Sequence, residues 1–395
     1  MCEPAPGLDT NFTESETFCD TNTTDVANQT VFDGFVEQFA GALSVYYTPL
    51  LVTLGTVGNS VSVFVFYSSK LRLQSTSQYL SALALSDTLF LFQLLPPWLY
   101  ALRLSGSFNS DGYCQFFVYI SYVTCCLSAW LVVAFTVERF VAVLYPLRRN
   151  AVCTVARARH VILALAAAAA LLNLPVLRFA LPTHNDCTID KRYIDLAARF
   201  NLVDTAVTFT VPLLMIIVLN SWITVGVCRL ERARQVMMKA ERPAGAGGSR
   251  PGQRVRPPRP GAGCPRSQQR VTRMLLIVSS VFVVLNMPAY TMRIIAYAYN
   301  TNSGEYGTSW EGFQQVATIC FNTNFGINFI LYCLSGQNFR RALLQSIPWL
   351  RNRARRAVAV RRNTSHPARA SSISSKLPTM VTVQLSIYLI RRNYY

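Results

Sequence analysis

The stretch YCQFFVYISYVTCCLSAWLVVAFTVERF, residues 113–140, joins a long apolar run directly to an acid and an arginine. Residues 113–137 contain no Asp, Glu, Lys or Arg, and about 20 apolar residues are enough for a helix to cross a bilayer. Glu138 and Arg139 follow at the end of this run. Charges at such a depth are costly and usually functional. The stretch therefore predicts a membrane-spanning helix that ends in a functional ion pair.

Six further apolar runs have a similar length. They cover residues 43–67, 79–102, 161–177, 202–228, 274–292 and 312–334. Asp87 and Asp204 are the two charged residues within the seven runs, although 14% of the chain is charged. The buried strands of a soluble α/β enzyme are only about four to eight residues long, which argues against that class. The sequence predicts an all-α protein, a seven-transmembrane helix bundle.

The basic residues predict the orientation of this bundle. The first 42 residues carry eight acids and no Lys or Arg, which places the amino terminus outside. With this orientation, 31 of the 37 Lys and Arg residues fall on the inner side. The net charge of +18 then faces anionic lipid and a partner protein rather than nucleic acid. Basic loops also arise as topology signals alone, and this alternative explains many individual arginines.

The segments outside the membrane differ in composition. Residues 1–42 form a polar, helix-poor extracellular tail with three glycosylation sequons, at Asn11, Asn22 and Asn28. Within the receptor domain, 43–347, the Arg-, Pro- and Gly-rich loop 241–267 is expected to be disordered. Before the cytoplasmic tail, 348–395, apolar residues recur every four positions at Phe339, Leu343 and Ile347. This spacing predicts a short amphipathic eighth helix on the inner membrane surface.

An ordered set of short motifs resembles the rhodopsin-like (class A) G-protein-coupled receptors over about residues 43–347. The set comprises Gly58-Asn59, LALSD at 83–87, Cys114 at 25 residues before Arg139, Tyr145-Pro146-Leu147, Pro212, Phe282 with Pro288, and Asn328-Phe-Ile-Leu-Tyr332 followed by Phe339. The resemblance implies a plasma-membrane receptor that signals to a heterotrimeric G protein and is regulated by arrestin and receptor kinases. It also implies a disulfide between Cys114 and Cys187, which both lie on the predicted outer side.

The resemblance assigns activation roles to Glu138, Arg139, Pro288, Asn328 and Tyr332. In the family, the Glu138–Arg139 pair opens and frees the arginine for the G protein. A pair that merely extends to interfacial water is the alternative. Pro212 and Pro288 each remove a helix hydrogen bond, which predicts kinks at mid-membrane.

Polar residues from four runs need partners inside the hydrocarbon, and a shared cluster is the simplest arrangement. The residues are Asn59, Asp87, Ser128, Asn324 and Asn328. In the family such a cluster holds a sodium ion in the resting state, and no other cofactor is expected. The alternative is a structural network filled by ordered water.

Two kinds of residue that the predicted helices lack narrow the class of ligand. Ser121 stands where similar amine receptors carry an Asp, and none of the lysines lies within a predicted helix, which argues against amines and retinal. The outer half instead offers charges of both signs with aromatic and amide groups, which suit a peptide. The predicted ligand-binding residues are Arg103, Tyr122, Asp204, Tyr290, Arg293 and Gln314. Asp204 and Arg293 could alternatively pair with each other as a structural bridge.

Two more features concern the subgroup of receptors that the chain resembles and the aromatic residue that acts as a switch in the family. Asn286-Met-Pro288 and Asn324-Phe-Gly-Ile-Asn328 resemble invertebrate receptors for amidated neuropeptides, of the FMRFamide, CNMamide and thyrotropin-releasing-hormone-like groups. Asn286 also replaces the Trp that many members carry two residues before the proline, so the family's aromatic switch does not transfer to this chain. Asn220 and Phe329 depart from the family pattern as well.

Other classes of function have weaker support. The three histidines are far apart and share no spacing with Cys, Asp or Glu that predicts a metal site or a catalytic dyad. We therefore do not expect an enzyme. A polytopic channel or transporter is the alternative, but it predicts more polar residues along the helices than this chain has.

Overall fold

The computed structural model describes residues 22–104, 110–182, 187–240, 266–302 and 309–346. Asn11, residues 241–265 of the predicted disordered loop, and the cytoplasmic tail lie outside these ranges. Asn22 and Asn28 lie within a helix, but their side chains are outside the description as well.

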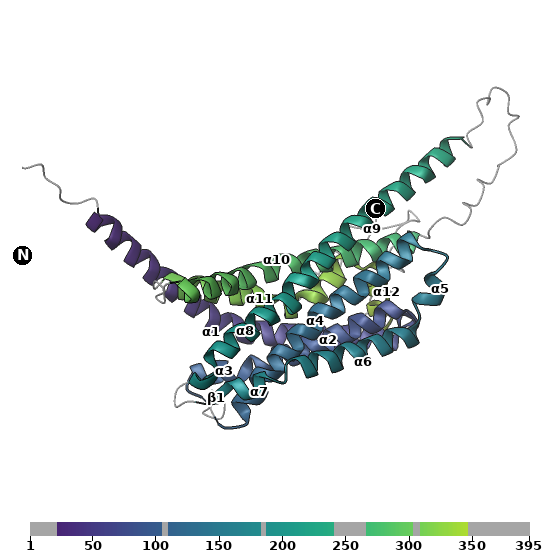
Figure 1. Cartoon of the computed structure of the whole chain (residues 1–395). Helices are drawn as coiled ribbons and strands as arrows, with labels where there is room; N and C mark the ends of the chain where they lie inside the picture. Colours follow the sequence, from purple (N-terminus) through teal and green to yellow (C-terminus); the bar gives the residue numbers. More distant parts are fainter. Residues whose placement is uncertain (1–21, 105–109, 183–186, 241–265, 303–308, 347–395) are drawn as a thin grey trace, which may run out of the picture.

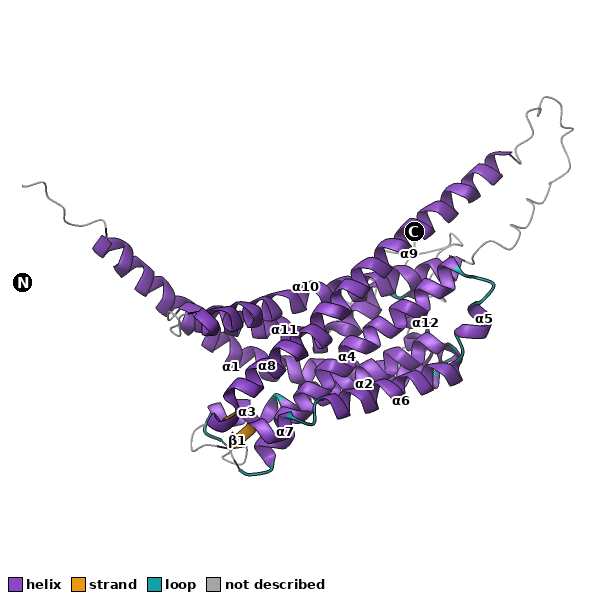
Figure 2. Ribbon diagram, viewed as in Figure 1, coloured by secondary structure: helices purple, strands orange, loops and turns teal. Residues whose placement is uncertain are grey.

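Seven long helical segments lie side by side in one bundle (Figure 1). They are α1 (Asn22–Ser68), α2 (Ser75–Gln93) with α3 (Leu95–Ala101), α4 (Tyr113–Leu144), α6 (Val155–Leu172) with α7 (Val176–Phe179), α8 (Ile194–Thr205) with α9 (Val211–Ala240), α10 (Arg266–Asn302) and α11 (Ser309–Ser335). Two short helices, α5 (Arg149–Val152) and α12 (Gln337–Ser346), lie at one end. Helices dominate the described part, as Figure 2 shows.

Seven spans are long and apolar enough to cross a membrane, which confirms the predicted number and order. They are Gln38–Ser68, Ser75–Ala101, Tyr113–Leu144, Val155–Phe179, Lys191–Leu230, Leu276–Ala296 and Gly312–Ser335. Each overlaps one predicted run, because length and apolar composition set both the prediction and the span.

The helix ends differ from the predictions in two places. The first helix begins at Asn22 rather than near residue 43, so the expected helix-poor tail is helical over its last part. Apolar residues recur there every three to four positions, at Phe32, Phe35 and Phe39, which is a helical period. At the other loop, α10 begins at Arg266, so the last two residues of the predicted disordered segment are helical.

The fifth span is interrupted before its proline. A π-helical turn, Ala206–Thr210, separates α8 from α9. Pro212 has no backbone N–H to donate to the preceding turn, and a wider turn accommodates that loss. In the sixth span Pro288 lies inside α10, which continues on both sides of it. Thr208 and Phe209, which lie in this turn, are both buried.

A disulfide and a hairpin cover the end of the bundle that the basic residues predict to be outside; this end is named the outer end and the opposite one the inner end. Cys114 at the start of α4 is bonded to Cys187, which confirms the predicted bridge. Cys187 begins β2 (Cys187–Ile189), which pairs antiparallel with β1 (Ala180–Pro182). The bridge joins residues 73 positions apart and so ties the connection after α7 to the third span.

α1 crosses α11 closely at Gly55 and Gly326, and a hydrophobic core, named the inner core, lies around Tyr332. The inner core contains the buried rings of Phe135, Phe282, Tyr332 and Phe339. Phe339 of α12 lies 5.5 Å from the ring of Tyr332, so α12 packs against the bundle through this residue. The position of α12 on a membrane surface remains a prediction.

Gly55 should be required for the crossing of α1 and α11. A Cβ at this position would lie 2.9 Å from Cα of Gly326, a backbone atom that cannot move alone. We expect Gly55→Ala to destabilise the protein by about 1–3 kcal/mol, the typical cost of overpacking. Thermal unfolding of the purified protein in lipid nanodiscs measures this effect. Gly41→Ala is the matched control, because a Cβ at Gly41 of the same helix meets no atom within 4 Å; equal midpoints for the two variants would contradict the prediction.

Candidate functional site

A cavity of about 580 Å³ opens in the outer half of the bundle, between α4, α8, α10 and α11. Four of the predicted ligand-binding residues line it: Tyr122, Tyr290, Arg293 and Gln314. Asp204 is buried behind the cavity wall, and Arg103 lies exposed at the turn after α3, so neither belongs to the lining. The sequence did not single out Asn201 and Phe321, which line the cavity too.

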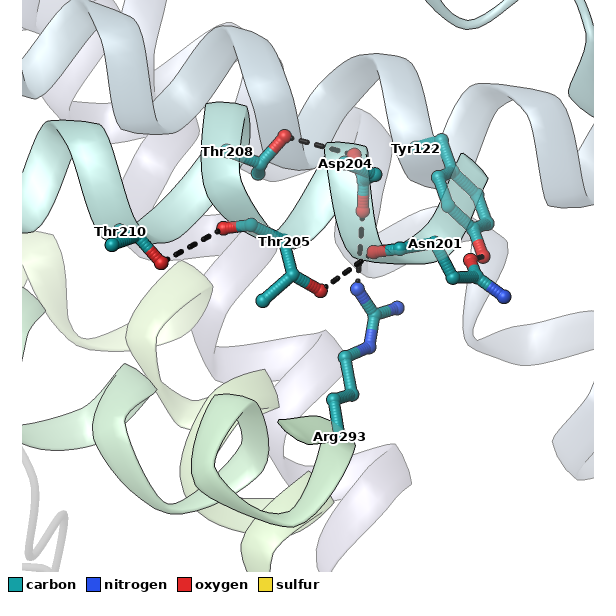
Figure 3. Close-up of polar contacts among 7 residues, drawn as sticks. All are labelled: Tyr122, Asn201, Asp204, Thr205, Thr208, Thr210 and Arg293. Atoms are coloured by element: carbon teal, nitrogen blue, oxygen red, sulfur yellow. Dashed lines mark hydrogen bonds and ion pairs between the residues drawn. The ribbon is translucent and has the colours of Figure 1, made fainter. Parts of the chain in front are cut away.

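Arg293 and Asp204 form an ion pair between α10 and α8, with 3.1 Å from Nη1 to Oδ2 (Figure 3). The Asp204 side chain is 6% exposed, whereas that of Arg293 is 45% exposed. Thr208 donates a hydrogen bond to the other carboxylate oxygen of Asp204 at 2.9 Å. Both oxygens of the buried carboxylate therefore have donors, and the arginine remains open to the cavity.

Aromatic and amide groups surround the guanidinium of Arg293. Its central carbon lies 5.8 Å from the ring centre of Tyr122 and 5.5 Å from that of Tyr290, within the range of cation–π attraction. The hydroxyl of Tyr122 donates to Oδ1 of Asn201 at 2.6 Å, and Figure 3 shows this contact beside the ion pair. These contacts restrain the arginine from α4 and α8 as well as from its own helix, which favours a fixed orientation.

A second cavity of about 350 Å³ lies between α1 and α11. The described part of its lining contains hydroxyl and amide side chains and no charged residue: Ser44, Tyr47, Thr48, Gln314, Gln315, Thr318 and Asn322, with Leu51 and Ile319. Gln314, Thr318 and Asn322 line both cavities, so the two spaces adjoin along one face of α11. Together they give the outer half room for a ligand with several polar groups.

Aromatic rings form the inner wall of the main cavity and link four helical segments. Tyr290 of α10 stacks on Phe209 with centroids 4.1 Å apart, and contacts Phe321 of α11 edge to face at 6.0 Å. Phe321 lies 5.7 Å from Phe90 of α2, which stacks on Phe325 at 3.7 Å. Phe209 itself lies in the π-helical turn before α9 and outside the lining. The rings connect the cavity to the centre of the bundle.

The predicted polar cluster surrounds Asp87 at the centre. Ser128 donates to one oxygen of this carboxylate at 2.9 Å, and Asn328 donates to the other at 2.6 Å. Asn59 donates to the backbone carbonyl of Phe325 at 2.9 Å, while its own Oδ1 is buried and has no hydrogen-bond partner among the residues that the structure describes. Asn324 is buried on the same helix as Asn328. The structure thus joins α2, α4 and α11 by hydrogen bonds at one buried carboxylate, and Asn59 joins α1 to α11 through Phe325.

At the inner end, Glu138 holds several donors at once. Its Oε1 accepts hydrogen bonds from Ser75 at 2.7 Å and Thr76 at 2.8 Å, and Nη2 of Arg139 lies 3.0 Å away. The side chains of Arg139 and Glu138 are only 10% and 7% exposed, so the pair is buried rather than extended to interfacial water. Nε of Arg139 is buried without a partner in the described part of the chain. Glu138 therefore restrains Arg139, although one nitrogen of the guanidinium has no hydrogen-bond partner among the described residues.

The order of these features along seven spans matches a known family. Residues 58–332 match the family described as 7 transmembrane receptor (rhodopsin family). The chain belongs to this family. It is therefore a multi-pass membrane receptor and not an enzyme, and the alternative of a channel or transporter is not favoured.

Several receptors are similar to this chain over most of their length. Human neuromedin-U receptor 1 (Homo sapiens) is 27% identical over 314 residues, which cover 75% of this chain and 71% of that receptor. Bovine thyrotropin-releasing hormone receptor (Bos taurus) is 25% identical over 311 residues, or 74% and 75% of the two chains. Mouse neurotensin receptor type 1 (Mus musculus) is 27% identical over 348 residues, or 80% and 79%.

The structure explains what the unusual residues of this receptor do. Asn286 donates to the backbone carbonyl of Phe282 at 2.6 Å, one turn earlier in the same helix, so it provides no ring at the cavity floor. Asn220 of α9 donates to the hydroxyl of Ser279 of α10 at 2.8 Å and thereby joins the fifth and sixth spans. Phe329 packs its ring against that of Phe339 at 6.0 Å.

Sequence reasoning about this receptor missed the hydroxyl groups that donate to two of its buried carboxylates, Glu138 and Asp204. Ser75 and Thr76 open α2 with two adjacent hydroxyls, which is an ordinary pattern at a helix start and gave no sign of a contact with Glu138. Thr208 was equally inconspicuous, although its spacing of four residues from Asp204 places both on one helical face. This spacing is the one signal that a reading of the sequence could have used.

Proposed function

We propose that this receptor binds an extracellular peptide and signals to a heterotrimeric G protein. The outer cavity carries the argument, because it combines a charged group, four aromatic rings and several amides in a space of about 580 Å³. Peptides need such a mixture, since backbone amides, side chains and termini require several partners at once. The three relatives described above are named for neuromedin U, thyrotropin-releasing hormone and neurotensin, which are peptides.

The proposed orientation places the amino terminus outside the plasma membrane and the carboxyl terminus in the cytoplasm. Its support is the distribution of basic residues, 31 of 37 of which then face the cytoplasm. The disulfide between Cys114 and Cys187 lies at the opposite end, where an oxidising compartment favours it. Arrestin and receptor kinases are the further cytoplasmic partners in this proposal.

Arg139 is the proposed contact for the G protein. It is held beside Glu138 at the inner end of α4, and the same carboxylate holds the start of α2 through Ser75 and Thr76. Burial of a charge is costly unless it is paired, so a movement that exposed the inner end would release Arg139 readily. The pair therefore stabilises the resting arrangement of the inner end.

Contacts between aromatic rings would transmit a movement from the ligand cavity to the inner end of the bundle. Tyr290 lines the cavity and stacks on Phe209, which lies just before Pro212 in the interrupted fifth span. A ligand that moved Tyr290 would therefore shift the fifth and sixth spans relative to each other. In this receptor Tyr290 takes the place of the aromatic switch that Asn286 cannot provide.

A sodium ion at Asp87 is part of the same proposal. Carboxylate, hydroxyl and amide oxygens suit a small hard cation, and the unpartnered Oδ1 of Asn59 is an additional acceptor in the cluster. Asp87, Ser128 and Asn59 would hold the ion, with Asn324 and Asn328 around them. When bound, the ion would neutralise the buried carboxylate. Ordered water could satisfy the same groups.

The function is tested by a peptide library applied to cells that express the receptor with a broadly coupling Gα subunit. Neuromedin U, thyrotropin-releasing hormone, neurotensin and amidated peptides belong in the library. We expect at least one peptide to release calcium, and an inhibitor of that Gα subunit to remove the response. Cells without the receptor are the control. A peptide-evoked current that persists under the inhibitor would indicate a channel instead.

Arg139→Ala should abolish this signalling. Surface expression and peptide binding should remain, because Arg139 lies at the opposite end from the cavity. Radioligand binding and G-protein dissociation measure the two properties separately. Arg157→Ala, at an exposed position at the start of α6, is the matched control and should signal. Wild-type signalling by Arg139→Ala would refute its proposed role.

Phe209→Leu should uncouple ligand binding from signalling. The substitution removes the ring stacked on Tyr290 but leaves the cavity lining intact. We expect a peptide affinity within about threefold of wild type and a maximal response reduced by half or more, since loss of such a pair is worth about 1 kcal/mol. Phe92→Leu, at an exposed position on α2, should behave as wild type. A full response from Phe209→Leu would rule out the proposed route.

Sodium should stabilise the wild-type receptor through Asp87. We expect a higher midpoint of thermal unfolding in sodium chloride than in choline chloride at equal ionic strength, and no such difference for Asp87→Asn. The comparison requires no agonist. An equal midpoint of the wild type in both salts would favour the water-filled network.

A further inference from the structure

The second cavity, of about 350 Å³ between α1 and α11, has no role in the proposed peptide site. Its volume lies within the range of about 300–1,000 Å³ that is usual for small-molecule sites. The described lining comes from one face of each helix, at positions from Ser44 to Leu51 on α1 and from Gln314 to Asn322 on α11. The space therefore lies between two neighbouring helices rather than at the centre of the bundle.

The second cavity lies at the level of the outer leaflet. The first span covers Gln38–Ser68, and Ser44 and Leu51 follow its outer end by 6 and 13 positions. At a rise of about 1.5 Å per residue, the cavity extends from about 9 to about 20 Å below that end. One turn further in, α1 and α11 meet at Gly55 and Gly326. This contact closes the inner side of the cavity.

Two adjacent helices can wall a space on only two opposite sides. On one open side the second cavity adjoins the main cavity, because Gln314, Thr318 and Asn322 line both. Next to the lining positions, Leu50 of α1 and Phe313 of α11 are exposed. Exposed apolar side chains on a membrane span face lipid. The other open side therefore gives a lipid from the bilayer a way into the cavity.

The chemistry of the lining selects a neutral head group. Its described side chains carry no charge, so a phosphate, carboxylate or ammonium head would lie there without an opposite charge, which is costly. The hydroxyl of Thr48 and the amide of Gln314 can each both donate and accept hydrogen bonds. A head that carries hydroxyl groups matches this set.

Gln315 gives a second, independent indication of a ligand. It lines the cavity, and its Oε1 is buried without a hydrogen-bond partner among the residues that the structure describes. A buried acceptor that receives no hydrogen bond destabilises a protein. A molecule that brought an O–H group to this oxygen would remove that cost, whereas an ester without a hydroxyl could not.

We propose that the second cavity binds the head of a neutral, hydroxyl-bearing lipid of the monoacylglycerol class from the outer leaflet. The hydroxyl groups of the head donate to Oε1 of Gln315 and bond to Thr48, and the acyl chain remains in the bilayer beside α1 and α11. This site is separate from Arg293 and the aromatic rings of the main cavity. The inference does not depend on a peptide ligand.

The test uses monooleoylglycerol as the probe, with methyl oleate and oleate for comparison. Methyl oleate has the same chain without a hydroxyl, and oleate carries a charge. The purified full-length receptor is placed in phosphatidylcholine nanodiscs with increasing mole fractions of each lipid. We expect the midpoint of thermal unfolding to rise to a plateau with monooleoylglycerol alone, which gives an apparent Kd as a mole fraction.

Gln315→Leu should weaken the binding of monooleoylglycerol about fivefold, the equivalent of about 1 kcal/mol for one hydrogen bond. Its midpoint without the probe should be no lower than that of the wild type, because the substitution removes an acceptor that has no partner among the described residues. Thr48→Val has nearly the same shape as the wild type and should also weaken binding, so the site can be tested by a second variant.

Gln93→Leu is the matched control. Oε1 of Gln93 on α2 is likewise buried without a partner among the described residues, but Gln93 lies outside the described linings of both cavities. This variant should bind monooleoylglycerol as tightly as the wild type.

Three results would overturn the inference. A wild-type midpoint that does not respond to monooleoylglycerol would indicate that ordered water fills the cavity. An equal rise with methyl oleate would indicate a general effect of the lipid mixture. Wild-type affinity in both Gln315→Leu and Thr48→Val would show that the lipid binds elsewhere. A failure of the peptide library in cells would refute the proposed function and leave this lipid site standing.

Discussion

Hydrocarbon offers no hydrogen-bond partner, and every other feature of this receptor depends on that constraint. A polar or charged group within the seven spans must find its partner on another helix or remain at a cost of several kcal/mol. Asp87, Glu138 and Asp204 are buried carboxylates, and in each the hydrogen bonds come from side chains on at least one other segment or turn. These three groups therefore fix the relative positions of the helices that hold them.

The three carboxylates lie at successive levels of the bundle and have different partners. Asp204 pairs with an arginine that also faces a cavity, Asp87 accepts from neutral donors, and Glu138 holds both an arginine and two hydroxyls. The outer pair is suited to meet a ligand because one partner is 45% exposed. The inner pair is buried, so its charge becomes available only when the helices move.

Aromatic rings connect the outer level with the centre. Phe325 shows the connection most directly, because its ring stacks on Phe90 while its backbone carbonyl accepts from Asn59. Packed rings move together rather than one by one, since protein interiors are as dense as organic crystals. The replacement of the usual aromatic by Asn286 therefore does not interrupt the connection, because Tyr290 contacts rings on both sides.

The sequence by itself determined the seven spans, their order and the disulfide, because apolar length is a local property and the family motifs fix the spacing. It also identified Asp87 as important, since charges are rare in such runs, and Arg139 and Arg293 as charges that lie just beyond the ends of two runs. Tertiary structure decided which hydroxyl groups donate to the buried carboxylates Asp204 and Glu138. Thr208 and Ser75 are common helical residues whose contacts depend on a π-helical turn and on the approach of α2 to α4. The net charge that a ligand meets is a sum over two helices, so it could follow only from the folded arrangement.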